Sequence, residues 1–185
     1  MRFFVSILGL FKSVFHISMV VGVIFLFLSC GEDRSKTTNP TTQQKVVSPD
    51  EVALVVLGTA QDAGSPQIGC AKMCCATIGE TRYVVALGVV DSISQKTYLF
   101  EATPDIGAQI DFLNQVSGND KSAMPDAIFL THAHIGHYTG LMYLGKEAVN
   151  AQKVPVHAMP KMASFLKENG PWGQLVKNKN IHLNT

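Results

Sequence analysis

Three histidines directly after a short apolar run constrain this chain more than any other feature. The run ends at Leu130, and the sequence continues THAHIGHYTGL. In an extended segment residues i and i+2 point to the same side, so His132 and His134 can direct their imidazoles at one point, and a turn at Gly136 then brings in His137. Imidazole is a common ligand for zinc and also suits iron and manganese, so we predict a metal site here. The alternative is a solvated loop with three unrelated histidines.

The hydrophobic pattern around this cluster predicts a layered domain. β-Branched apolar runs predict strands, and apolar residues spaced at i, i+4, i+7 and i+10 from Ile106 predict a helix. The expected strands are 52–57, 82–91, 97–102, 127–130 and 154–158, and the expected helices are 105–115, 138–149 and 161–168. Strand pairs followed by alternating strands and helices predict a mixed α/β or α+β fold.

The N-terminal segment carries the features of an export signal. Arg2 and Lys12 precede and interrupt a long apolar stretch, and Cys30 follows a small residue at its end. This pattern predicts a lipoprotein-type signal over 1–30 with Cys30 lipidated, and the alternative is an uncleaved anchor helix. Either interpretation predicts an exported, membrane-anchored protein on the periplasmic or cell-surface side.

The composition of the remainder of the chain distinguishes a tether from a folded domain and indicates which classes of partner to expect. Residues 31–50 are rich in Thr, Gln, Ser and Pro and predict a flexible tether, so the domain is expected over 51–185. A formal net charge of +1 gives no electrostatic basis for nucleic-acid binding. We expect a small-molecule or peptide substrate, and contact with the membrane only through the N-terminal lipid or anchor.

A cluster of cysteines and one aspartate are further candidates for function. Cys70, Cys74 and Cys75 are close enough in sequence to bind one metal, or a bridge between Cys70 and Cys74 could form instead. Asp62 lies in a Gly-rich loop after the first strand, where it is either a catalytic residue or a turn residue. Asp105 is expected to cap the helix that follows it.

The histidine segment resembles the His-x-His-x-Asp-His motif of the metallo-β-lactamase superfamily. That resemblance implies an αββα sandwich and a metal-dependent hydrolase. It makes His132 and His134 ligands of a first metal and His137 a ligand of a second. Gly136 stands where the family has an Asp that binds the second metal, which puts the second metal in doubt and favours a non-catalytic binding lipoprotein as one alternative.

The loop 58–67 and the cysteines resemble the family of pyrroloquinoline quinone biosynthesis protein B, as does Pro171-Trp172. This resemblance implies that Cys70, Cys74 and Cys75 hold a structural zinc, and it offers an oxidative step as another alternative. Complete members of the superfamily supply further ligands from a second half of the fold. The sequence therefore predicts only the first half of the sandwich.

Overall fold

The computed structural model describes residues 47–76, 79 and 81–185. The chain divides into two units, 1–43 and 44–185, and every described residue belongs to the second. The predicted signal segment with Cys30 and most of the predicted tether lie outside the described residues. At the end of that tether, the Val47 side chain already packs against the core, and its N–H donates to the Val116 carbonyl at 3.0 Å. Within the described part of the chain, no helix is long and apolar enough to cross a membrane.

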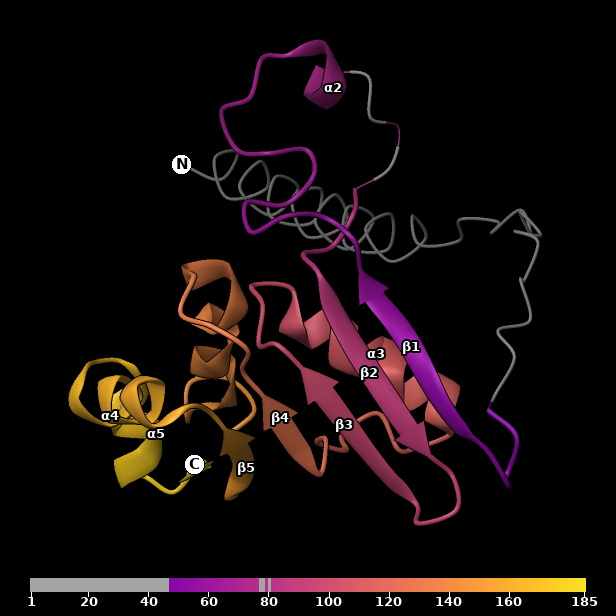
Figure 1. The fold of residues 1–185 in the computed structure, drawn as a ribbon, viewed down its shortest axis with the longest axis vertical. Helices are drawn as coiled ribbons and strands as arrows, with labels where there is room; N and C mark the ends of the chain where they lie inside the picture. The colour runs from indigo at the N-terminus through magenta and orange to yellow at the C-terminus, as the bar shows by residue number, and fades with distance from the viewer. Residues whose placement is uncertain (1–46, 77–78, 80) are drawn as a thin grey trace, which may run out of the picture. The chain divides into compact units, whose positions relative to one another are not determined.

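A single six-stranded sheet organises the unit (Figure 1). Its strands follow one another in chain order, so each strand lies beside its neighbour in sequence. The first three strands are antiparallel and the last three add in parallel. The strands are β1 (Val52–Gly58), β2 (Ala86–Asp91), β3 (Lys96–Phe100), β4 (Ala127–Phe129), β5 (Val154–His157) and β6 (Ile181–Asn184). β2 and β3 form an antiparallel hairpin.

Helices cover one face of this sheet. They are α3 (Ile106–Ser117), α4 (Pro160–Glu168) and α5 (Trp172–Lys177), with 3₁₀ turns η1 (Ile135–His137) and η2 (Thr139–Leu144), while the short helix α2 (Met73–Ala76) lies in the loop between β1 and β2 (Figure 1). In Figure 1, α3 lies behind β1 and β2, and its apolar side packs on the first three strands. The side chains expected to face the core do so, and α3 ends at Gly118, whose φ of 74° is the left-handed conformation that glycine favours.

The predicted helix over 138–149 is wrong. The chain forms the 3₁₀ segment η2 over 139–144 and then a series of turns. Leu141 and Leu144 are its fully buried apolar residues, and their three-residue spacing matches a 3₁₀ turn rather than an α-helix. Gly140 explains the position of η2, because a Cβ there would lie 1.9 Å from the Thr103 carbonyl oxygen. The short elements α5 and β6 were not predicted.

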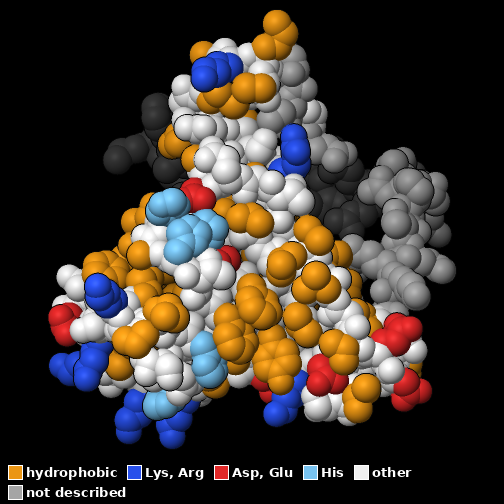
Figure 2. Space-filling view, viewed as in Figure 1, with side chains coloured by type: hydrophobic (Ala, Val, Ile, Leu, Met, Phe, Trp, Pro, Cys, Tyr) orange, Lys and Arg blue, Asp and Glu red, His pale blue; other side chains and the backbone are white. Residues whose placement is uncertain are grey.

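The other face of the sheet is apolar and open. Leu54 and Val56 of β1 remain 65% and 57% exposed. On the same face the rings of Phe100 and Phe129 stack at 5.1 Å between centroids, and Phe129 stacks on His157 at 4.7 Å. Figure 2 shows hydrophobic side chains gathered over the strands on this face. The described residues thus form one sheet with helices on one of its two faces.

Stability should depend on the contact between α3 and the sheet. Leu113 of α3 is 1% exposed, and its methyl groups lie where a side chain at Gly88 of β2 would be. We expect Leu113→Ala to lower the free energy of unfolding by about 2–5 kcal/mol, because it leaves a cavity in the core. The exposed neighbour Gln115→Ala is the control and should change it by less than about 0.5 kcal/mol. Equal effects in urea unfolding would contradict this account of the core.

Candidate metal centre

The histidine segment is fixed to the end of β3 by backbone hydrogen bonds. The Ala102 N–H donates to the His137 carbonyl at 2.8 Å, and the Gly140 N–H donates to the Ala102 carbonyl at 2.8 Å. The Glu101 N–H donates to the Phe129 carbonyl at 2.9 Å, which aligns the ends of β3 and β4. The segment after β4 is therefore held at the carboxyl ends of β3 and β4. Because these two strands are parallel neighbours, the residues that follow each of them lie close together.

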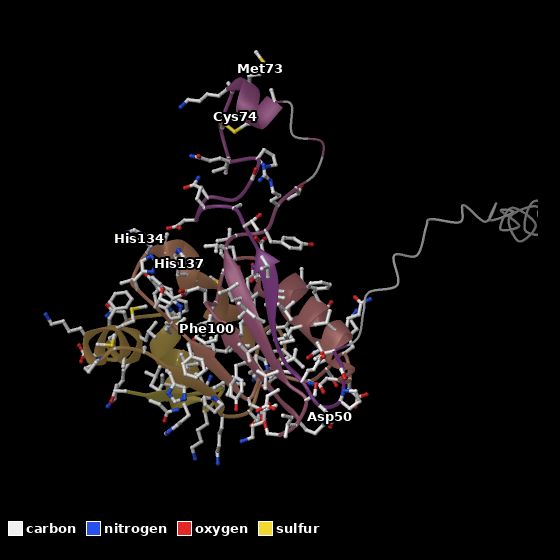
Figure 3. All side chains as sticks on the ribbon, turned by 45° about the vertical axis from the view of Figure 1, so that its right-hand side comes forward. Asp50, Met73, Cys74, Phe100, His134 and His137 are labelled. Atoms are coloured by element: carbon white, nitrogen blue, oxygen red, sulfur yellow. A yellow bond between two sulfur atoms is a disulfide. The ribbon has the colours of Figure 1, made fainter. Side chains whose placement is uncertain are left out.

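Of the three predicted histidines, His132 lies beside both of the others, whereas the ring centroids of His134 and His137 are 6.4 Å apart, and among the described residues the converging ligand atoms do not include His134. The ring centroids of His132 and His134 lie 4.6 Å apart, and those of His132 and His137 lie 4.1 Å apart. Figure 3 shows the labelled His134 and His137 side by side. The His137 side chain is 8% exposed and the His134 side chain 74% exposed, so the cluster extends from the core to the surface. The turn expected at Gly136 is the 3₁₀ segment η1.

Asp62 joins the cluster from the loop after β1. Its Oδ1 lies 2.9 Å from His137 Nε2, and its Oδ2 lies 3.5 Å from His134 Nδ1. The hydrogen bond from His137 lowers the pKa of the Asp62 carboxyl, and the charges of both histidines lower it further. Asp62 therefore presents an ionised carboxylate to the histidine cluster.

Glu101 is a candidate site residue that the sequence did not predict. Its carboxylate is buried and accepts a hydrogen bond from the Thr131 hydroxyl, which in turn lies 2.8 Å from His132 Nδ1. Because the hydroxyl donates to the carboxylate, it accepts the N–H of His132 Nδ1. This network assigns the proton to Nδ1 and leaves His132 Nε2 with a free lone pair for a metal.

The backbone at Glu101 supports a functional role for this residue. Its φ of 76° is a left-handed conformation that costs a non-glycine residue on the order of 1–3 kcal/mol. Such conformations cluster at functional sites. Glu101 lies within the strand expected over 97–102, and no spacing in the sequence distinguishes it from the other strand residues.

The donor set fits a metal ion. One ligand atom each of Glu101, His132 and His137 lie within 4.8 Å of one another. His137 Nδ1 is buried without a hydrogen-bond partner and lies 3.6 Å from Glu101 Oε2. Leaving a buried imidazole nitrogen unpaired is costly, and the Glu101 carboxylate would accept a proton on Nδ1 if Nε2 held a cation. Imidazole and carboxylate donors together suit zinc, manganese or iron.

The remaining candidates from the sequence lie elsewhere. The capping role predicted for Asp105 is wrong, because its Oδ2 accepts the Val84 N–H at 2.8 Å and makes no cap hydrogen bond to α3. This bond joins the start of α3 to the segment before β2. Trp172 is buried against Tyr138 and Phe165, as expected of a packing residue. His182 is exposed on β6, outside the cluster.

The cysteine loop brings its three sulfur atoms within 4.8 Å of one another. Cys70 and Cys75 are joined as a disulfide with Cα atoms 6.1 Å apart, while Cys74 is free and exposed (Figure 3). This pairing differs from the Cys70–Cys74 bridge considered from the sequence. The short helix α2 places adjacent cysteines on different sides, so Cys75 and not Cys74 meets Cys70. A zinc held by three thiolates remains a prediction for the reduced loop.

Comparisons with known proteins agree with this geometry. Residues 96–184 match the family model of the Beta-lactamase superfamily domain. No curated protein sequence matches the chain. The fold is similar to that of Zn²⁺-bound PqqB from Methylobacterium extorquens, with 21% sequence identity, a TM-score of 0.56, and coverage of 73% of this chain and 49% of that chain. It is also similar to a diphosphatase from the PhnP family, with 24% identity, a TM-score of 0.54, and coverage of 72% and 49%.

These similarities show a mixed α/β sheet with helices of the metallo-β-lactamase type. The resemblance to that superfamily, predicted from the histidine segment, is confirmed. The chain spans about half the length of the solved structures it matches, 49% of each. The activity of a whole protein of this kind is therefore a matter for proposal.

Alkylation followed by peptide mass mapping determines whether Cys70, Cys74 and Cys75 are free, disulfide-bonded or bound to zinc. For the protein with the Cys70–Cys75 disulfide we expect Cys74 alone among the three cysteines of this loop to be alkylated in denaturant without reductant. Addition of reductant should then expose all three thiols. Labelling of all three after unfolding and chelation alone would contradict the disulfide and support the zinc site, because zinc protects thiolates without oxidising them.

Proposed function

We propose that this protein is a metal-dependent hydrolase of the metallo-β-lactamase type, with its metal held by His132, His134 and His137. The observation that carries the proposal is His137, buried with an unpartnered Nδ1 and surrounded by two carboxylates and two imidazoles. The family match over 96–184 supports the reaction class, and the Zn²⁺ of the similar PqqB structure supports zinc as the metal. Iron and manganese suit the same donors.

The chain's own residues prepare the site. Glu101, through Thr131, sets the His132 tautomer so that Nε2 faces the site unprotonated. Asp62 adds a carboxylate to the site, 2.9 Å from His137 Nε2. When bound, the metal supplies a Lewis acid that polarises the substrate and lowers the pKa of water. The protein contributes a fixed set of donors, which costs no reorganisation during the reaction.

A cavity beside His132 gives room for a substrate. Its volume is about 410 Å³, within the range of small-molecule sites. The walls are largely apolar, with Met159, Met162 and Phe165 among them, and Lys161 supplies one cation. We propose a small-molecule or peptide substrate with an apolar group and an anionic group. The diphosphatase of similar fold acts on a substrate of anionic character, which agrees with this choice.

Export and membrane tethering through residues 1–30 and Cys30 belong to this proposal. They rest on the sequence of that segment alone.

An oxidative reaction is the second candidate. It is favoured by the likeness to PqqB and by the cysteine loop that prompted the same comparison from the sequence. It predicts iron rather than zinc at the histidines and oxygen consumption with a peptide substrate. Zinc in the site without oxygen consumption would remove it.

Substitution of the histidines tests the proposed function. We expect His132→Ala and His134→Ala each to lower metal content, measured by mass spectrometry of the purified protein, and to lower hydrolysis of a chromogenic phosphodiester at least tenfold. The matched control is His182→Ala, an exposed histidine outside the cluster, which should leave both unchanged. Unchanged metal content in the two cluster variants would sink the proposal. Metal binding without hydrolysis in the unaltered protein would indicate a binding protein instead.

A further inference from the structure

Gly136 leaves a space that another residue fills. The metallo-β-lactamase motif has an Asp at this position, and here no side chain is present. A Cβ added to Gly136 would lie 2.7 Å from Asp62 Cβ and 2.8 Å from Asp62 Cα. Real Cβ atoms do not approach so closely, so a side chain at 136 and Asp62 in its present place exclude each other. The loop after β1 therefore occupies the volume that the motif's own side chain would take.

The residue in that space carries the same functional group. Asp62 directs one oxygen at His137 Nε2, at 2.9 Å, and the other at His134 Nδ1, at 3.5 Å. The carboxylate thus contacts two of the three histidines of the cluster from outside the motif. A residue that only stabilised its own turn would not be expected to contact both histidines.

The loop that presents Asp62 is anchored on both sides of it. Before Asp62 the Thr59 and Ala60 N–H groups both donate to the Tyr83 carbonyl, at 3.0 and 2.9 Å, and after it the Ser65 carbonyl accepts the Arg82 N–H at 2.8 Å. The carboxylate is partly exposed, at 35%, so an ion from solvent can reach it. A ligand must be both held and accessible, and Asp62 meets both conditions.

We propose that Asp62 is a metal ligand, and that it replaces the carboxylate that the histidine motif lacks at Gly136. The inference rests on the metal site of the proposed function. His137 Nε2 donates a hydrogen bond to Asp62 Oδ1 at 2.9 Å; a divalent cation held by these two atoms would displace the ring proton to Nδ1, which faces the Glu101 carboxylate at 3.6 Å. The carboxylate that is absent at Gly136 is then supplied by Asp62 from the loop after β1, and the metal site is retained.

Cobalt binding tests this inference without any assay of activity. Co²⁺ is titrated into purified protein on a Cys74→Ser background, so that the free thiol of the cysteine loop does not compete. We expect Asp62→Asn to weaken Co²⁺ binding at least tenfold and to change the visible cobalt spectrum, because an oxygen ligand is lost. Asp62→Glu should retain part of the affinity. Asp111→Asn, an exposed carboxylate on α3, is the matched control and should bind as the parent does.

The outcomes separate this inference from the proposed function. An Asp62→Asn protein that binds Co²⁺ with the parent's affinity and spectrum would overturn the inference. Weaker binding with an unchanged spectrum would also overturn it, since Asp62 would then only orient the histidines. Both results leave the histidine site and the hydrolase proposal standing. A parent protein that binds Co²⁺ through Asp62 but hydrolyses nothing would support the inference and contradict the proposed function.

Discussion

The hydrogen bonds at Ala102 are the contacts on which the site depends. Ala102 donates to the His137 carbonyl and accepts from the Gly140 N–H, both at 2.8 Å, so the end of β3 fixes both sides of the turn that carries His137. The close approach requires a glycine at 140. Because Glu101 directly precedes Ala102, the same contact brings its carboxylate to the histidines. A peptide carrying only the histidine segment would have the ligands without the buried carboxylate that positions them.

The sequence predicted what is local and missed what depends on distant contacts. The histidine cluster and α3 were recognised because their spacing is visible within a few residues. Glu101 has no such pattern, and its role arises only when β3 and β4 pair. Asp105 carries the residue type of a cap, but a backbone N–H some twenty residues away in sequence takes its carboxylate. In place of the helix expected after His137 the chain forms η2, in which Gly140 lies too close to the Thr103 carbonyl to carry a side chain.

The arrangement of the sheet explains why the site lies where β3 and β4 end. Helices cover one face, the other face remains apolar and open, and the strand ends carry the polar groups. Large exposed apolar surfaces usually contact another layer or partner. In the sandwich of the superfamily that layer is a second sheet. The site described here is one set of donors, drawn from the ends of β3 and β4 and the loop after β1.

Anomalous diffraction from crystals soaked in Zn²⁺ tests the central claim most directly. Data collected on either side of the zinc absorption edge locate the ion without reference to activity. The account predicts a peak within about 2.0–2.2 Å of nitrogen atoms of His132, His134 and His137 and of an Asp62 oxygen. A peak confined to the cysteine loop, or no peak near the histidines, would contradict it.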